Sequence, residues 1–323
     1  MSSSIVPPKS SSTSDCDASF QSGSITLVLD APRTAITSEN PLPLNFRSMN
    51  SIPNISGGRA SGSAQYSRTQ IQNMISGGVV GQPLTVVDLR QESHGFVTLA
   101  QAVNGETEIA VSWFVERDWI NVAKGPDSIE ADELNRLGSL AKSSSVTVYD
   151  VKSKTPNEDG ICTVTPYSVS PSGSFANEQT VLQPFQTGYL RLPTTDHCRP
   201  RDSEVDDFVA FEMSLDPNAW LHFHCRAGDG RTTTFLAMHD IIHNAPADSL
   251  PAILTRQGPS GIGGVDLGTA PKNQADFDYP FSAERVAFMQ NFYTYVCAAK
   301  PKGFALAWSA WLRTTHPSQS VES

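Results

Sequence analysis

A cysteine and an arginine stand six residues apart in the stretch HCRAGDGRT, which covers residues 224–232. Its two glycines allow the backbone to turn so that several N–H groups converge on one anion. A helix that begins near Thr232 would direct its positive N-terminal end at the same point. Both fields favour the thiolate form of Cys225, and a thiolate is a competent nucleophile. The stretch therefore predicts a phosphate-binding loop built around a nucleophilic cysteine.

The residues of this stretch have separate expected roles in phosphoryl transfer. Arg231 supplies a planar guanidinium that binds two phosphoryl oxygens and stabilises their charge in the transition state. The Thr232 hydroxyl is placed to hydrogen-bond the sulfur, which eases the departure of the sulfur when water attacks the phosphocysteine. His224 is expected to support the loop from the preceding strand. The positions expected to contact the phosphate are Arg226, Ala227, Gly228, Asp229 and Gly230.

Two other interpretations of this region are weaker. A cysteine at the end of a strand can be a small buried hydrophobe, but the flanking His, Gly, Gly and Thr argue against that role here. His222, His224 and Cys225 lie close together in the sequence, yet no second pair of metal ligands follows at a usable spacing. We therefore expect no metal and no cofactor, so the loop alone must neutralise the phosphate.

Strand and helix patterns alternate around the loop and predict an α/β fold with an at least partly parallel sheet. Leu221 and Phe223 alternate into the core and deliver Cys225 at the carboxyl end of its strand, where open α/β sheets bind ligands. The expected strands are 84–90, 146–151, 188–193 and 220–225, and the expected helices are 68–76, 131–142, 203–215, 232–243 and 282–296. We assign to the core the helical stripe Val286, Met289, Tyr293 and Val296, and also Trp308 and Trp311.

Charge and composition exclude several classes of function. The 323 residues carry 23 Lys and Arg against 33 Asp and Glu, a net charge of −10, so the basic footprint of a general nucleic-acid binder is missing. The sequence contains no stretch of about 18 consecutive apolar residues, so it predicts no membrane-spanning helix. The five cysteines include no CxxC pair, which fits a reducing compartment. The partner is expected to be a small anionic molecule, with neither a nucleic acid nor a membrane involved.

The loop and several further blocks resemble the cysteine phytases of bacteria, which are protein-tyrosine-phosphatase-like (PTP-like) enzymes. The resemblance spans about residues 42–316 and rests on blocks such as FRS at 46–48, VVDLRQESHGF at 86–96, YLRLPTTDH at 189–197 and WSAWL at 308–312. It implies an α/β PTP-like domain with a central mixed sheet flanked by helices and a small, mostly β insert. It also implies stepwise removal of phosphates from myo-inositol polyphosphates such as phytate (myo-inositol hexakisphosphate), without a metal.

The resemblance implies further site residues by position. Asp196 matches the general acid, which protonates a basic leaving alkoxide and contributes about 10²- to 10⁴-fold in rate; from the residues alone it could equally be a turn or cap residue. The positions that match further substrate contacts are Arg47, Asp118, Lys152, Lys154 and His197. Lys272 stands alone where better-known members carry a Lys-rich loop, so distal phosphates have fewer expected contacts.

Domain boundaries follow from composition and from the resemblance. Residues 1–24 contain ten Ser and few apolar side chains, which cannot offset the entropy of ordering. We expect a mostly disordered leader over residues 1–40, a phosphatase domain over 41–316 with an insert at about 115–182, and a tail over 317–323. The N-terminus lacks a cleaved-signal pattern, so we expect either the bacterial cytoplasm or injection into a host cell.

Several alternatives stay open at this point. The same catalytic residues could act on phosphotyrosine in a protein, or the chain could bind inositol phosphates without turnover. The glycine-rich segment 258–268 lacks the GxGxxG order of a nucleotide loop, so we interpret it as a flexible loop. Cys198 stands two residues after Asp196, which raises the hypothesis of a protective disulfide with Cys225.

Overall fold

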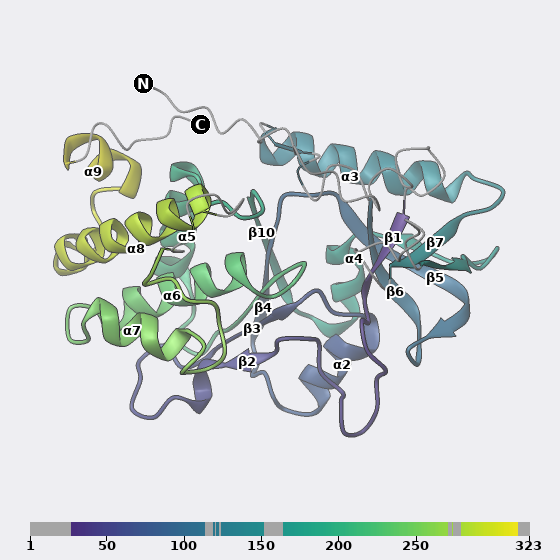
Figure 1. Cartoon of the computed structure of the whole chain (residues 1–323), viewed down its shortest axis with the longest axis horizontal. Coiled ribbons are helices and arrows are strands. Elements are labelled where there is room, and N and C mark those ends of the chain that lie inside the picture. The colour runs from purple at the N-terminus through teal and green to yellow at the C-terminus, as the bar shows by residue number, and fades with distance from the viewer. Residues whose placement is uncertain are drawn as a thin grey trace.

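The chain forms two β-sheets with helices packed around them (Figure 1). The computed structural model describes residues 27–113, 119, 121–122, 124–151, 164–270, 273 and 279–315. Within these residues, one sheet has five strands and the other has six. This mixed α/β architecture confirms the fold class expected from the alternating sequence pattern.

The five-stranded sheet has the order β10-β4-β11-β3-β2. Its strands are β10 (Gly188–Thr194), β4 (Leu84–Arg90), β11 (Trp220–Cys225), β3 (Ala60–Ala64) and β2 (Arg47–Ser48). All neighbours run parallel except β2, which pairs antiparallel with β3. Cys225 pairs with Ala64, and His224 pairs with Asp88. The carboxyl ends of the three central strands therefore meet at Cys225, where a parallel sheet binds its ligands.

Five helices gather on one side of this sheet in Figure 1. They are α5 (Asp202–Ser214), α6 (Gly230–Asn244), α7 (Leu250–Gln257), α8 (Tyr279–Ala299) and α9 (Trp308–Thr315). Helix α6 is buried along almost its whole length and packs on the sheet through Phe235, whose ring lies 6.4 Å from that of Phe223. This burial holds the N-terminal end of α6 against the end of β11, which is the position that an anion-binding loop requires.

The core face of α8 is rotated relative to the sequence prediction. Met289 and Val296 are buried as expected, but Val286 and Tyr293 are only half-buried. Phe288, Phe292 and Tyr295 instead contact Trp308, with ring centroids 5.5, 5.9 and 5.6 Å apart. The prediction missed this face because α8 is apolar on several sides, so periodicity alone does not define one stripe. The core positions predicted for Trp308 and Trp311 are confirmed.

The six-stranded sheet has the order β8-β7-β1-β6-β5-β9. Its strands are β8 (Val164–Ser168), β7 (Thr147–Val151), β1 (Leu27–Ala31), β6 (Glu106–Trp113), β5 (His94–Val103) and β9 (Phe175–Ala176). Strand β1 is buried at all five positions, so the predicted leader over residues 1–40 is wrong for this part. The bounds predicted for the insert, about 115–182, are also too narrow for this sheet, because it includes strands from residues 27–31 and 94–113. A composition shift marks only where the chain changes character, and it cannot show which distant strands pair.

A tight hairpin joins β5 to β6. Asn104 and Gly105 both have positive φ, 53° and 85°, and they connect the paired residues Val103 and Glu106. Asn-Gly between two strands is the strongest short-range hairpin signal. This signal was available in the sequence at 104–105 and would have placed both strands correctly.

Further helices lie beside and between the two sheets. Helix α3 (Pro126–Ala141) starts five residues before the predicted helix over 131–142, with proline in its first turn. Helices α2 (Arg68–Ser76) and α4 (Glu178–Leu182) supply Ile71, Met74, Val181 and Leu182 to a core that also contains Phe96 of β5 and Trp220 of β11. Short 3-10 turns occur at Met49–Ser51, Gln183–Phe185 and Lys300–Lys302. In the described part of the chain, no helix has the length and apolarity needed to cross a membrane.

Candidate active site

The loop after β11 wraps around the sulfur of Cys225. The Sγ atom accepts hydrogen bonds from the Gly228 backbone N–H at 3.2 Å and from the Thr232 hydroxyl at 3.2 Å. Cys225 is 3% exposed. Gly228 has φ +78°, and a Cβ at this position would collide with the backbone of Ser63 and Ala64. Only glycine lets the loop pass this close to β3, so the contacts predicted for Gly228 and Thr232 depend on this turn.

Arg231 is fixed behind the loop by a carboxylate that the sequence analysis did not single out. Its Nη1 and Nη2 atoms donate to Glu92 at 2.7 and 3.1 Å, and Nη1 also reaches the Thr194 carbonyl at 3.2 Å. Among the described residues, the buried Nε atom has no hydrogen-bond partner. Glu92 therefore orients the guanidinium and leaves one donor for a ligand.

Glu92 and Arg231 each stabilise the charged form of the other. Burial opposes ionisation of Glu92, but Arg231 and Arg90 outweigh it and hold the pKa of Glu92 well below its usual range. Burial likewise disfavours the Arg231 cation, yet Glu92, Asp196 and Cys225 raise the pKa of Arg231 well above its usual value. Both groups are charged at neutral pH, so the loop keeps a permanent buried cation beside the sulfur.

The predicted general acid lies beside this guanidinium. An Oδ1 atom of Asp196 is 3.1 Å from Nη2 of Arg231, and its Oδ2 atom is 3.3 Å from Nε2 of His197. The Asp196 side chain is 25% exposed, so it faces the opening of the site. His197 has φ +65°, a left-handed conformation that turns the chain directly after the acid. The structure thus brings Asp196 and His197 to the loop as the resemblance implied; their roles in catalysis stay predictions.

Arg47 lies under the loop. Its guanidinium donates to the Gly228 carbonyl at 2.7 Å and to the Thr233 hydroxyl at 2.9 Å, and the residue is 5% exposed. Burial lowers the pKa of Arg47, while the nearby Cys225 and Asp229 oppose that change. This placement makes Arg47 a support for the loop, and its contact with substrate stays a prediction.

Arg226 points toward the six-stranded sheet. Its Nε atom donates to Asp30 of β1 at 2.8 Å. Burial opposes ionisation of Asp30, but Arg90 and Arg226 outweigh it and keep the pKa of Asp30 well below its usual range. The positive charge of Arg226 is therefore balanced by Asp30, and this contact ties the loop to the second sheet.

Asp229 and Ala227 form the exposed turn of the loop. Asn45 spans this turn, since its Nδ2 atom donates to the Ala227 carbonyl at 2.9 Å and to Asp229 Oδ1 at 3.0 Å. Burial and the nearby Asp196 raise the pKa of Asp229, and Arg47 opposes them. The carboxylate of Asp229 is thus turned toward Asn45, which fixes the loop from its outer side.

Arg285 is a second cation near the loop that sequence reasoning missed. It lies on α8 and is 9% exposed. A Cβ on Gly230 would collide with its guanidinium, so the side chain packs directly on the first residue of α6. Glycine at 230 makes this approach possible. The only sequence signal was an arginine inside an otherwise apolar helical stripe.

Two histidines support the loop from behind. His222 contacts the hydroxyls of Ser61 and Ser63 at 2.9 and 3.1 Å, and burial, followed by the neighbouring His224, lowers its pKa to about 3. His222 is therefore neutral at physiological pH. His224 lies with Nε2 3.1 Å from Glu178 Oε2. This arrangement buries His224 behind the loop, and its supporting role stays a prediction.

Cys198 does not have the environment of a redox-active cysteine. Both Cys198 and Cys225 are free thiols. Burial, together with the Glu284 and Asp196 carboxylates, raises the pKa of Cys198 to about 12. A thiol with this pKa is protonated at neutral pH and is a poor partner for thiol exchange. The structure therefore gives no support to a protective disulfide between the two.

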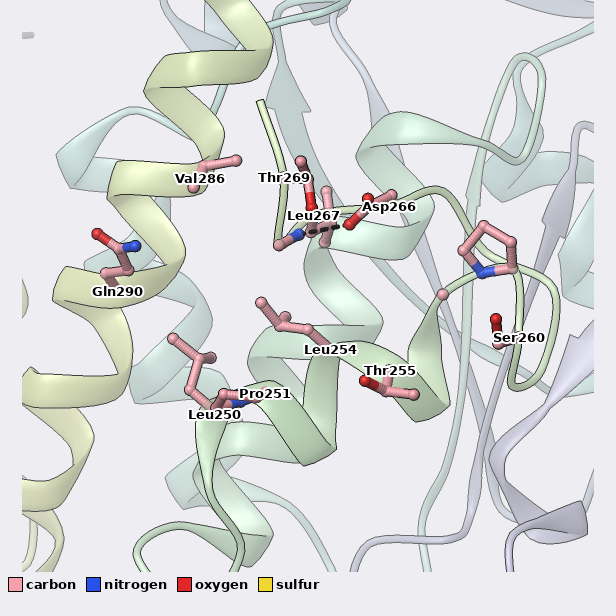
Figure 2. A pocket seen from close by; sticks show the side chains of 13 residues that line it. Leu250, Pro251, Leu254, Thr255, Ser260, Asp266, Leu267, Thr269, Val286 and Gln290 are labelled. Carbon is pink, nitrogen blue, oxygen red and sulfur yellow. Dashed lines mark hydrogen bonds between the residues drawn. The ribbon is translucent and has the colours of Figure 1, made fainter. Parts of the chain in front are cut away.

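Four of the predicted contacts lie outside the described residues: Asp118, Lys152, Lys154 and Lys272. A pocket of about 500 Å³ lies elsewhere, between α7, α8 and the segment 258–269 (Figure 2). Leu250 and Leu254 of α7 face Val286 and Gln290 of α8 across it, and no residue of the 224–232 loop lines it. This pocket is therefore separate from the candidate active site.

Known proteins share this fold and sequence pattern. The family model for PTP-like phytases, whose description is "Inositol hexakisphosphate", matches residues 87–243. A PTP-like phytase structure from Bdellovibrio bacteriovorus has a TM-score of 0.67 and 34% identity, with 89% of this chain and 94% of that chain covered. A structure of the PTP-like myo-inositol phosphatase from Mitsuokella multacida, in complex with myo-inositol-(1,3,4,5)-tetrakisphosphate, has a TM-score of 0.72 and 30% identity, with 88% and 48% covered.

Another relative of this chain is a bacterial effector protein. Effector protein hopD2 of Pseudomonas syringae pv. tomato is 29% identical over 260 residues, which cover 78% of this chain and 51% of that protein. This chain thus spans about half the length of hopD2 and of the Mitsuokella protein.

Proposed function

The chain belongs to the family of PTP-like phytases, and we propose that it hydrolyses phosphomonoesters of myo-inositol polyphosphates through a phosphocysteine. One observation carries the proposal above all others. The Cys225 sulfur lies in a loop whose backbone N–H and Thr232 hydroxyl point at it, beside an Arg231 guanidinium that Glu92 orients. Phosphoryl transfer needs such a nucleophile together with fixed positive charge where the phosphoryl oxygens lie.

In the first step, the Cys225 thiolate attacks phosphorus, an S–P bond forms and the P–O bond to the inositol ring breaks. Arg231 binds the phosphoryl oxygens through Nε, which has no hydrogen-bond partner among the described residues, and through Nη2, which Asp196 contacts in the free site. Asp196 is released from that contact and, as the protonated acid, gives its proton to the leaving alkoxide.

In the second step, water attacks the phosphocysteine, and the Asp196 carboxylate takes one proton from that water. The S–P bond breaks and inorganic phosphate leaves. The Thr232 hydroxyl, already 3.2 Å from the sulfur, stabilises the returning thiolate. Asp196 thus ends the cycle protonated and ready for another substrate.

The substrate class rests on the family and on the surroundings of the loop. The Mitsuokella relative was determined with a bound inositol tetrakisphosphate. Arg285 adds a cation beside Gly230, and the predicted contacts Lys152, Lys154 and Lys272 would hold further phosphates. A pocket that binds several phosphates selects a polyphosphate over a single phosphotyrosine.

We also propose that the chain acts inside a host cell. Its likeness to effector protein hopD2 supports this proposal, and the Ser-rich residues 1–24 suit an export leader. A translocation reporter fused to the full chain should be delivered into host cells, and deletion of residues 1–24 should abolish delivery. Undiminished delivery would contradict the proposed leader.

The test of the activity is phosphate release from phytate with a chelator present. The wild-type chain should release phosphate stepwise, and Cys225→Ser should lower kcat by at least about 10⁴-fold, since the attacking atom is lost. Chromatography of the products identifies the ring position attacked first. A phosphotyrosine peptide cleaved far faster than phytate would keep the catalytic residues and overturn the substrate.

A further inference from the structure

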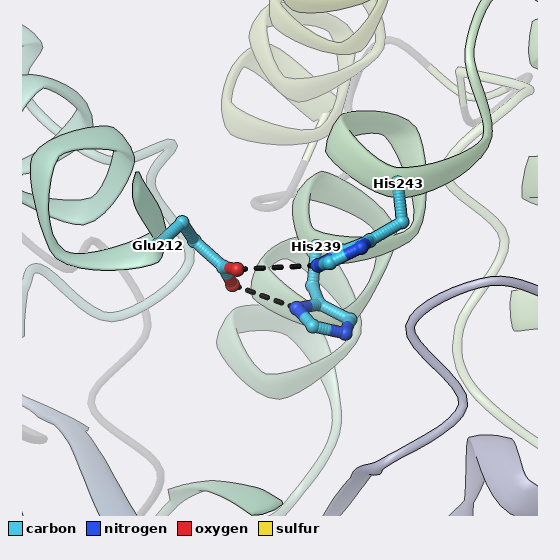
Figure 3. Close-up of side chains that lie close together, drawn as sticks. All are labelled: Glu212, His239 and His243. Atoms are coloured by element: carbon cyan, nitrogen blue, oxygen red, sulfur yellow. Dashed lines mark hydrogen bonds and ion pairs between the residues drawn. The ribbon is translucent and has the colours of Figure 1, made fainter. Parts of the chain in front are cut away.

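Three metal-type side chains meet at the end of α6 far from the loop. Figure 3 shows Glu212 of α5 pointing at His239 and His243, which lie four residues apart on one face of α6. Their ligand-type atoms lie within 4.8 Å of one another. His239 is eight residues beyond Arg231, which along a helix is about 12 Å. The cluster is thus outside the catalytic machinery.

We propose that Glu212, His239 and His243 form a binding site for one late first-row divalent ion, of which Zn²⁺ is the expected occupant. Two imidazoles and one carboxylate form a donor set that suits zinc. A spacing of four residues on a helix places both imidazoles on one side of the ion, as in other helical zinc sites. The carboxylate comes from a second helix, so the ion would join α5 to α6.

The histidine nitrogens lie near the distances that a tetrahedral site needs, each from a different oxygen of the Glu212 carboxylate, so this carboxylate would turn one oxygen to the ion on binding. Bonds of about 2.0–2.2 Å to zinc set ligand atoms about 3.3 Å apart. His243 Nε2 is 3.4 Å from Glu212 Oε2, which meets this value. His239 Nδ1 is 2.7 Å from Glu212 Oε1, so this contact would open by about half an ångström on binding. The His243 side chain is 36% exposed, which leaves a path for the ion and room for water as the fourth ligand.

The orientation of His239 is already that of a ligand. Its Nε2 atom donates to the Gly57 carbonyl at 2.8 Å, which leaves Nδ1 directed at Glu212. Metal-binding histidines almost always use their second nitrogen in this way. Gly57 has φ +69°, and a Cβ there would lie 2.6 Å from the His243 ring and 2.9 Å from His239 Nε2. Glycine at 57 thus allows both rings and the carbonyl to come together.

A second cluster of similar composition is already neutralised by protein cations. Asp88, His94 and Glu178 also place ligand atoms within 4.8 Å of one another, but all three are fully buried. Asp88 Oδ2 accepts from the Tyr189 hydroxyl at 2.9 Å and lies 3.2 Å from Arg191 Nε. An ion would have to displace these partners without a path from solvent. Within the described part of the chain, the Glu212 cluster forms ion pairs with its two histidines and with no guanidinium, and it opens to solvent.

Zinc binding to chelator-stripped full-length protein tests this site. The measurement uses Cys225→Ser protein, so that the nucleophile cannot hold the ion, and titration calorimetry with Zn²⁺. We expect one bound ion per chain and a rise in Tm on its addition. His243→Gln, a change at a partly exposed position, should weaken binding at least tenfold and remove the Tm rise. The matched control Asp207→Asn, an exposed carboxylate also on α5, should bind as the parent does.

Co²⁺ absorption identifies the ligands. A tetrahedral visible spectrum without a thiolate charge-transfer band supports the site, and a thiolate band overturns it. Absence of Zn²⁺ binding to the stripped protein, or equal binding by His243→Gln, also overturns it. These outcomes do not depend on phosphatase activity, so this proposal and the proposed function can fail separately.

Discussion

The two ends of helix α6 attract groups of opposite charge. At the N-terminal end, the loop from Cys225 to Gly230 directs the Gly228 N–H at the sulfur, beside Arg231. At the C-terminal end, the Lys300 ammonium donates to the carbonyls of His243 and Ala245 at 2.8 and 3.0 Å. A helix carries partial positive charge at its start and partial negative charge at its end. One buried helix therefore offers an anion site at one end and attracts cations to the other.

The difference also lies in how each end is supported. The N-terminal end depends on side chains from several strands and loops, since Glu92, Arg47 and Asn45 all bind the loop or its arginine. The C-terminal end depends on α5, the residues after α6 and the turn at Gly57. Changes at the first end should alter the chemistry, whereas changes at the second should alter stability and leave turnover intact.

Among changes that leave the nucleophile in place, the largest effect is expected for Asp196→Asn. An amide cannot protonate the leaving alkoxide, so kcat on phytate should fall by about 10²- to 10⁴-fold. A substrate with a good leaving group, such as p-nitrophenyl phosphate, needs less acid assistance and should lose much less. Equal losses on both substrates would argue against the role of Asp196 as acid.

Glu92→Gln tests the support of Arg231 at the same end. The amide keeps the size of Glu92 but removes the charge that orients the guanidinium, so kcat should fall by about 10- to 100-fold with little change in KM. Arg231 itself stays in place and charged, which separates this positioning role from a catalytic one. A rise in KM alone would show that Glu92 acts only on substrate binding. Steady-state kinetics on phytate gives both values.

His222 links the loop to acid stability. Its pKa of about 3 in the folded chain lies below the unfolded value of about 6.5, so the unfolded chain binds more protons between these values. The contribution of His222 to the free energy of unfolding is therefore fully present above about pH 6.5, and it is lost as the pH falls from 6.5 toward 3. The groups that face His222 are Ser61, Ser63, His224, Glu178 and Arg47.

His222→Asn should remove this part of the pH dependence. Between pH 7 and pH 5, the wild type should lose about 2 kcal/mol more unfolding free energy than the variant. Urea titrations at both pH values measure the difference. Parallel losses in the two proteins would show that other groups cause the acid sensitivity.

The smallest effect is expected at the other end of α6. Lys300→Gln removes a cation from the last carbonyls of the helix, so unfolding free energy should fall by about 0.3–1 kcal/mol. Turnover of phytate should stay within twofold of wild type. A large loss of activity would mean that the two ends of α6 are coupled, contrary to the division described above.

The local parts of the active site could be predicted from sequence. The strand over 220–225, the glycine turn, the start of the helix that follows and the hydrogen bond from Thr232 to Cys225 all lie within the thirteen residues 220–232. Steric and hydrogen-bond constraints over such a short range act through neighbouring residues, so the residue types specify the loop. The hairpin turn at Asn104-Gly105 depends on an equally short stretch of sequence, so it too could have been predicted.

Contacts between distant segments could not be predicted in this way. Nothing in the residue types of Glu92, Asp30 or Arg285 shows that they reach Arg231, Arg226 and Gly230. The same holds for Glu212, which meets His239 only because α5 packs on α6.

The sequence by itself thus determined the loop around Cys225 and pointed to the class of reaction, because both depend on neighbours in the chain. The tertiary structure alone decided which carboxylates orient or neutralise the arginines and which strands form the second sheet. Those choices depend on how the sheets and helices pack, since side chains that are far apart in sequence meet only when burial of the core brings their elements together.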